Sequence, residues 1–130
     1  MIYLASPYSH DSAAVRQQRY DDACQALVQL LHAGHAVFSP IVHSHPLVSY
    51  GLPTDWAFWQ RVDQEYLRRC DQVIVLMLDG WEDSRGVAAE IDIARELKLP
   101  IDYLSPEMIS NWSGGVTSIS VRPSSQETSI

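Results

Sequence analysis

The fold is decided by the stretch VIVLML at residues 73–78. A continuous apolar run of this length is typical of a strand that is covered on both of its faces. Such a strand occupies the middle of a parallel sheet, so the sequence predicts helices on both sides of it.

Three shorter apolar runs are predicted to complete the sheet, and they lie at residues 2–5, 36–38 and 100–104. Apolar residues recur at helical spacing between them. One helix follows a cap at Asp11 or Ser12 and stops at Gly34, the next begins at Thr54, and a third covers residues 87–97. Because strands and helices alternate, we expect an α/β fold, a three-layer α/β/α sandwich around a parallel, flavodoxin-like sheet.

The chain has 130 residues, of which 46% are hydrophobic, and this suits one globular domain. We predict an α/β domain over residues 1–112, ending in a short helix at residues 106–112. Residues 113–130 are rich in Ser, Thr and Gly and are predicted to form a flexible tail. A weak edge strand around Ile119 and Val121 is the alternative for that tail.

The charge balance limits the partners of the chain. Sixteen acidic and nine basic residues give a formal net charge of -7, which argues against a nucleic-acid polymer or an anionic membrane as partner. No apolar run is long enough to span a bilayer, and residues 1–7 do not resemble a signal peptide. Cys24 and Cys70 form no disulfide framework or zinc pattern. We therefore expect a cytoplasmic protein.

Three predicted loops follow the carboxyl ends of strands, where ligands bind in folds of this kind. They cover residues 6–10, 40–53 and 79–86. The second carries three prolines and Gly51, so a long loop is expected there. The candidate site should lie where these loops meet.

The first loop leads into a helix, and a helix start favours an anion. Ser6, Tyr8 and Arg19 are candidate substrate-binding residues, because Arg16 and Arg19 follow within two turns and have the reach to enter the same pocket. The alternative for this segment is a capped helix with solvated arginines.

Glu90 stands in the otherwise apolar stretch VAAEI at residues 87–91. Burial there would raise the pKa of its carboxyl, and a tyrosine or backbone donor could keep it ionised. A helix that starts near Ser84 presents Gly86 and Glu90 on one face. Glu90 is the only plausible nucleophile at this edge, and its alternative is an exposed helical carboxylate.

Other polar and aromatic residues are ambiguous by pattern alone. Asp63 lies on the helix before the central strand. His43 and His45 are spaced for a metal, but no third ligand follows at a recognisable spacing, so no metal site is predicted. Trp56 and Trp59 either stack on a base or belong to the core.

Four stretches resemble the motifs of one enzyme superfamily. IYLASP at residues 2–7, DQVIVLMLDG at 71–80, DSRGVAAEIDIA at 83–94 and LPI at 99–101 resemble those of nucleoside 2-deoxyribosyltransferases and the related nucleotide N-glycosidases. The match covers about residues 1–104. Within that superfamily the sequence is most similar to the domain of unknown function 1937 family.

The resemblance implies three catalytic residues. Glu90 matches the glutamate that attacks the anomeric carbon of the sugar. Tyr3 matches the tyrosine that orients it, and Asp63 matches the aspartate that handles the base. The Tyr3 hydroxyl is therefore expected within about 3.2 Å of the Glu90 carboxylate.

The resemblance also implies substrate-binding residues. Asp83 matches an aspartate that binds a sugar hydroxyl, whereas Ser84 stands where the nucleotide-hydrolysing branch holds a 5′-phosphate. These are competing alignments of one loop. Gly86 matches the glycine four residues before the glutamate. Arg85 and Asp92 depart from the family pattern.

The implied activity is cleavage or transfer of the N-glycosidic bond of a nucleoside or nucleoside 5′-monophosphate, without a metal or organic cofactor. We expect the monophosphate to be preferred, because Arg16, Arg19 and Arg85 lie near two helix starts in an acidic protein. The alternative is a non-catalytic nucleotide-binding or signalling module with the same pocket. A homo-oligomer is compatible with the resemblance.

Overall fold

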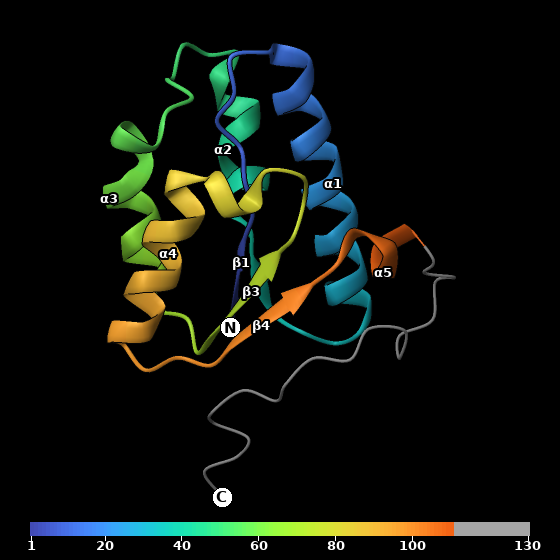
Figure 1. Ribbon diagram of the computed structural model, residues 1–130, viewed down its shortest axis with the longest axis vertical. Helices are drawn as coiled ribbons and strands as arrows, with labels where there is room; N and C mark the ends of the chain where they lie inside the picture. The colour runs from blue at the N-terminus through green and yellow to red at the C-terminus, as the bar shows by residue number, and fades with distance from the viewer. Residues whose placement is uncertain (111–130) are drawn as a thin grey trace, which may run out of the picture.

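The computed structural model describes residues 1–110, which form a four-stranded parallel sheet between two helical layers (Figure 1). The strands are β1 (Ile2–Ala5), β2 (Val37–Phe38), β3 (Gln72–Leu76) and β4 (Ile101–Leu104). They lie in the order β2-β1-β3-β4 and all pairs are parallel. This order confirms the predicted α/β/α sandwich. The strand predicted at residues 73–78 begins one residue earlier and ends two residues earlier than expected, since β3 covers Gln72–Leu76.

Strands β1 and β3 are buried on both faces because their side chains alternate between two cores. The core on one face contains Ile2, Leu4, Ile74 and Leu76 together with residues of the first helix. The core on the other face contains Tyr3, Ala5, Val73 and Val75. The continuous apolar runs of the sequence therefore describe central strands.

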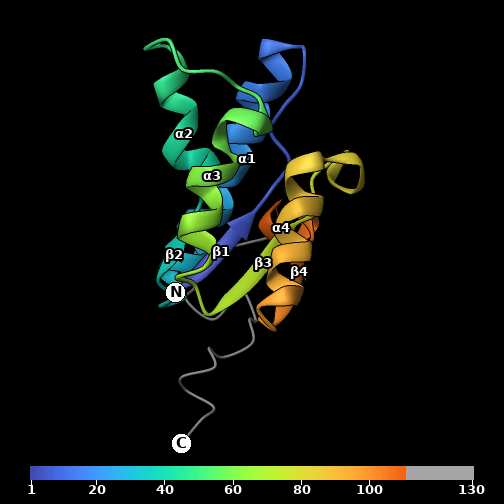
Figure 2. The same cartoon turned by 90° about the vertical axis from the view of Figure 1, so that its left-hand side faces the viewer.

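The helices cover the two faces of this sheet. α1 (Ala13–His32) lies on one side, with Ser12 as its N-cap, and α3 (Trp56–Leu67) and α4 (Arg85–Glu96) lie on the other. Figure 2 shows α3 and α4 side by side in front of the sheet. α5 (Pro106–Ser110) follows β4. The end of the helix expected at residues 106–112 and the predicted tail lie outside the described residues.

The prediction of a long loop over residues 40–53 is wrong. Residues Pro40–Val48 form the helix α2, and only the connection after it is irregular. Ser39 caps this helix by accepting a hydrogen bond from the Val42 amide at 3.2 Å. Pro40 is tolerated at the first position, where the missing N–H would have no partner within the helix. Of the three prolines, Pro40 therefore marks a helix start, Pro46 lies within the helix, and only Pro53 lies in the connection.

The segment between β3 and α4 brings the chain from the sheet edge to the site. It contains one turn of 3-10 helix, η1 (Trp81–Asp83), preceded by Gly80 with a φ of 84°. A Cβ at this glycine would lie 2.9 Å from a guanidinium nitrogen of Arg19. Glycine is thus required by both the backbone conformation and the close approach of that arginine.

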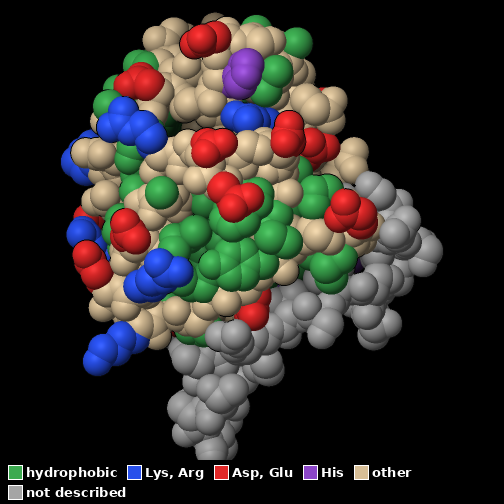
Figure 3. Space-filling model, viewed as in Figure 1, with side chains coloured by type: hydrophobic (Ala, Val, Ile, Leu, Met, Phe, Trp, Pro, Cys, Tyr) green, Lys and Arg blue, Asp and Glu red, His purple; other side chains and the backbone are tan. Residues whose placement is uncertain are grey.

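Strand β4 forms one edge of the sheet and carries exposed apolar surface. Figure 3 shows apolar side chains gathered near the middle of this face of the molecule. Tyr103 is exposed, and its ring lies 5.8 Å from the ring of Trp81. Among residues 1–110, none of the helices has the length and apolar character needed to cross a membrane.

Candidate active site

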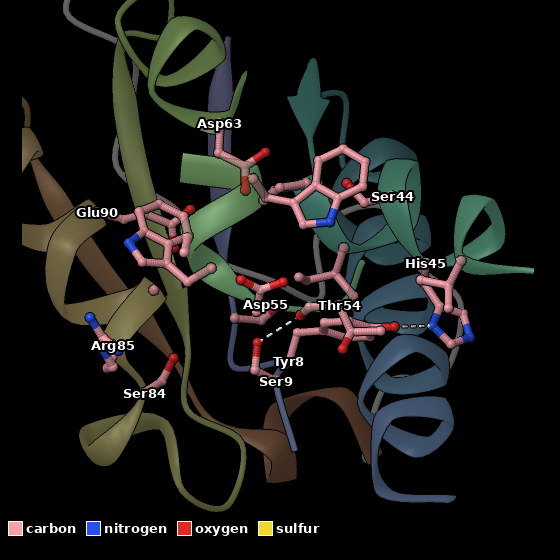
Figure 4. A pocket seen from close by; sticks show the side chains of 18 of the residues that line it. Tyr8, Ser9, Ser44, His45, Thr54, Asp55, Asp63, Ser84, Arg85 and Glu90 are labelled. Carbon is pink, nitrogen blue, oxygen red and sulfur yellow. Dashed lines mark hydrogen bonds between the residues drawn. The ribbon is translucent and has the colours of Figure 1, made fainter. Parts of the chain in front are cut away.

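A cavity of about 380 Å³ opens at the carboxyl ends of β1 and β3 (Figure 4). The strand order reverses at this point, since β2 lies on one side of β1 and β4 on the far side of β3. Open α/β sheets bind ligands at such a crevice, and the volume is within the range of small-molecule sites. Seven of the nine residues predicted for the site line the cavity: Ser6, Tyr8, Asp63, Asp83, Ser84, Gly86 and Glu90.

Glu90 and Tyr3 meet at the base of the cavity. Glu90 lies in the second turn of α4 and is 4% exposed, so the alternative of a solvated helical carboxylate is wrong. The hydroxyl of Tyr3, from the middle of β1, donates a hydrogen bond to Oε2 of Glu90. The contact expected between these two side chains is confirmed. Tyr3 itself lies behind Glu90 and does not line the cavity.

Asp63 reaches the same cavity from α3. Its side chain is 6% exposed, and burial raises the pKa of its carboxyl to about 7. Figure 4 shows Asp63 and Glu90 entering the cavity from neighbouring helices. The site therefore contains two desolvated carboxyl groups on the two helices that cover one face of the sheet.

The two carboxyl groups share a narrow titration range. The pKa of Glu90 is raised to about 8, chiefly by burial and to a smaller degree by the charge of Asp63, while the hydrogen bond from Tyr3 acts in the opposite direction. The pair therefore holds one proton between about pH 7 and pH 8. Burial gives Glu90 the higher pKa of the two and hence the larger share of that proton, and the hydrogen bond from Tyr3 opposes this by stabilising the ionised form of Glu90 beside a protonated Asp63.

The start of α4 forms the wall beside Glu90. Ser84 caps the helix, and its Oγ accepts from the Val87 amide at 3.2 Å, which leaves its own proton free to donate. Arg85 lines the cavity and has no ion-pair partner among residues 1–110. A Cβ at Gly86 would lie 3.3 Å from the indole of Trp56, so glycine lets this ring approach the wall.

Arg16 and Arg19 do not line the cavity, and the expectation that they reach it is wrong. Arg19 donates to the carbonyls of Ser9 and Asp79, each at 3.1 Å. It therefore connects the loop after β1 to the loop after β3. Arg16 donates to the carbonyl of His10. Both guanidinium groups support the backbone around the site instead of facing a ligand.

A hydrogen-bonded row on the opposite wall was not foreseen from the sequence. The hydroxyl of Tyr8 lies 2.6 Å from Nδ1 of His45, and Nε2 of His45 lies 3.0 Å from Oε1 of Gln17. Gln17 in turn donates to Asp21. These contacts follow from the helical structure of α2, which turns His45 toward α1, so a loop assignment for residues 40–53 could not reveal them.

The structure also places the histidine and tryptophan residues whose role the sequence pattern left open. His43 packs away from the cavity against the rings of Phe38 and Tyr66. No group of three or more metal-binding side chains occurs within residues 1–110. Trp56 and Trp59 both line the cavity, and Trp59 is also part of the buried core.

Comparison with solved structures identifies the class of fold. A 2-deoxyribosyltransferase from the psychrotolerant bacterium Bacillus psychrosaccharolyticus, described as a biocatalyst for the synthesis of antiviral and antitumoral nucleosides, is similar at a TM-score of 0.59 and 28% identity. The similarity covers 81% of this chain and 72% of that protein. The fold and the position of the cavity thus define a 2-deoxyribosyltransferase-like α/β protein.

The sequence comparison then gives the family. Residues 1–105 match the family described as "Domain of unknown function (DUF1937)", and the chain belongs to that family. A comparison with curated proteins finds no match.

Proposed function

We propose that this protein cleaves or transfers the N-glycosidic bond of a nucleoside or nucleoside 5′-monophosphate. The observation that carries the proposal is the buried contact between Tyr3 and Glu90 in a cavity that also contains Asp63. The similarity to a 2-deoxyribosyltransferase supports the same class of substrate. Retaining glycosidases divide this chemistry between one carboxylate nucleophile and one carboxylic acid.

In the proposed first step, a carboxylate oxygen of Glu90 bonds to the anomeric carbon while the bond from that carbon to the base nitrogen breaks. Asp63 transfers its proton to the departing base. In the second step, water or a second base attacks the anomeric carbon, gives its proton to Asp63 and releases Glu90. Tyr3 supports this sequence because its hydrogen bond favours an ionised Glu90 beside a protonated Asp63.

We further propose that the start of α4 binds a 5′-phosphate. The hydroxyl of Ser84, the side chain of Arg85 and the first two amides of the helix, those of Arg85 and Gly86, belong to the cavity wall beside Glu90. An anion is stabilised at a helix N-terminus and by a charge-assisted bond to arginine. In this proposal Asp83, in the same loop, binds a sugar hydroxyl while Ser84 binds the phosphate, so both residues contact the substrate.

The activity is tested with a panel of ribo- and 2′-deoxyribonucleosides and their 5′-monophosphates, with release of free base followed by chromatography. Product sugar distinguishes hydrolysis from transfer when an acceptor base is added. We expect base release from at least one member. Saturable binding without base release from any member would instead favour a nucleotide-binding module, and neither binding nor release would contradict both functions.

The phosphate proposal has its own measurement. We expect the monophosphate to bind about tenfold more tightly than its nucleoside at low salt, with the difference reduced at higher salt and in Ser84→Ala. Glu82→Ala, in the same loop but outside the cavity, is the matched control. Equal affinities that do not change with salt or with Ser84→Ala would show that the cavity recognises only sugar and base.

A further inference from the structure

Ser44 is a buried polar residue in the middle of α2 that lines the cavity. Its side chain is 8% exposed, and its hydroxyl has no hydrogen-bond partner within residues 1–110. A serine inside a helix usually donates to a carbonyl of the preceding turn, which this hydroxyl does not do. A buried hydroxyl without a partner destabilises the folded protein, so its presence in a cavity wall needs an explanation.

The wall formed by α2 faces the wall formed by α4 across the cavity (Figure 4). Its other polar side chain, His45, already uses both ring nitrogens in hydrogen bonds to Tyr8 and Gln17. Ile41 and Val48, which also line the cavity from α2, are apolar. On this wall Ser44 is thus the side chain with unused hydrogen-bonding capacity.

We infer that Ser44 recognises the polar edge of the base. The inference rests on the proposed function, in which the anomeric carbon lies at Glu90 on α4, so that the base extends past Asp63 toward α2. No bond holds the Ser44 hydroxyl in its present rotamer, so rotation into the cavity breaks nothing.

The chemistry of a hydroxyl defines the class of base. It both donates and accepts, so it can bond to an exocyclic amino group or to an exocyclic oxo group. At the position of that exocyclic substituent, a base that carries neither group offers Ser44 no hydrogen-bond partner. The inferred substrates therefore carry a base with an exocyclic amino or oxo group, and Ser44 discriminates little between these two groups.

Binding of free bases tests this without turnover, because a free base has no glycosidic bond. Adenine, hypoxanthine and unsubstituted purine are titrated into the whole chain, and fluorescence of Trp56 and Trp59, which line the cavity, reports binding. We expect adenine and hypoxanthine to bind with similar affinity, and purine about tenfold more weakly. Ser44→Ala should weaken adenine and hypoxanthine about tenfold and leave purine unchanged.

Thermal unfolding of the free protein gives a second readout. Ser44→Ala removes an unpaired hydroxyl and improves helix propensity, so we expect the Tm to rise by about 3 °C while base binding weakens. Ser49→Ala is the matched control. Its hydroxyl donates to the Pro46 carbonyl at 3.0 Å outside the cavity, so its loss should change no base affinity.

Three results would overturn the inference. They are wild-type affinity of Ser44→Ala for adenine, an equal loss for all three bases together with a lower Tm, and no binding of any base to the wild type. Ser44-dependent base binding without base release from any nucleoside would support the role of Ser44 and contradict the proposed reaction, so the two failures are distinguishable.

Discussion

The two faces of the sheet are buried to a similar degree but differ in chemistry. Toward α1 the core consists mainly of apolar side chains such as Leu4, Leu30 and Ile74, and the polar side chains buried there, Gln29 and Gln72, are uncharged. Toward α3 and α4 the core includes the hydroxyl of Tyr3, and the carboxyl groups of Glu90 and Asp63 lie beside it. Burial on the first face stabilises the fold, whereas burial on the second raises the pKa of two acids.

A single strand, β1, supplies side chains to both the apolar core and the core that contains the ionisable groups. Successive residues of β1 point to opposite faces, so Leu4 joins the apolar core while its neighbour Tyr3 contacts Glu90. A single-residue shift in register would exchange the two and destroy the site. Four measurements test the contrast between the two faces.

The largest effect is expected from Glu90→Gln, which keeps the shape of the side chain and removes its charge. We expect base release to fall by at least about a thousandfold while the fold remains intact, since the proposed nucleophile is lost. Activity is measured as free base per folded protein. Retention of more than a tenth of the wild-type rate would exclude Glu90 as nucleophile.

The second measurement concerns the pH dependence of stability. The folded state holds a proton on Glu90 up to about pH 8, whereas the unfolded chain releases it near its usual pKa of 4.5. The free energy of unfolding should therefore fall as pH rises between these values, by about 5 kcal/mol from Glu90 alone. Denaturant titrations at several pH values would detect this, and Glu90→Gln should reduce the fall to the part that comes from Asp63, whose pKa burial raises to about 7. Glu96→Gln, at the exposed end of the same helix, should retain it.

On the apolar face we expect a change in stability without a change in chemistry. Leu30→Ala should lower the free energy of unfolding by about 3 kcal/mol, because it leaves a cavity in the core against α1. Leu31→Ala, at the next position but 50% exposed, should change it by less than about 1 kcal/mol. A shifted pH–rate profile in Leu30→Ala would show that the two faces are coupled.

The smallest effect is expected from Tyr3→Phe, which keeps the ring and removes the bond to Glu90. The pKa of Glu90 should rise further, so the proton of the pair moves toward Glu90 and the rate falls about tenfold. The alkaline limb of the pH–rate profile should shift to higher pH. Tyr66→Phe, on α3 outside the cavity, serves as control. An unchanged profile in Tyr3→Phe would reduce Tyr3 to a packing role.

Much of the fold could be predicted because its apolar patterns are unambiguous. The run in β3 and the helical spacing in α1 each match one structure only. α2 was missed because three prolines outweighed its capping signal, the pair Ser39–Pro40 at its start. Without that helix, the direction in which Ser44 and His45 point could not be inferred.

The site was predictable where residue type and position were enough. Glu90 was identified because it is the charged residue of the apolar stretch at residues 87–91, and its contact with Tyr3 was expected from the family resemblance. The expectation for Arg19 was wrong because sequence spacing shows how far a side chain can extend but not where it points. Its guanidinium turns toward backbone carbonyls, which a sequence pattern cannot distinguish from an anionic ligand.

The central position of β1 has a consequence for synthesis of the chain. Its partner β3 is made about 70 residues later, and until then only the two-residue β2 can pair with it. Contacts so distant in sequence form slowly and leave apolar edges open to aggregation in the meantime. The Tyr3–Glu90 contact spans 87 residues and needs α4 as well. A stalled chain that ends before α4 therefore leaves β3 without its partner β4 and without the cover of α4, and it lacks the Glu90 side of the cavity.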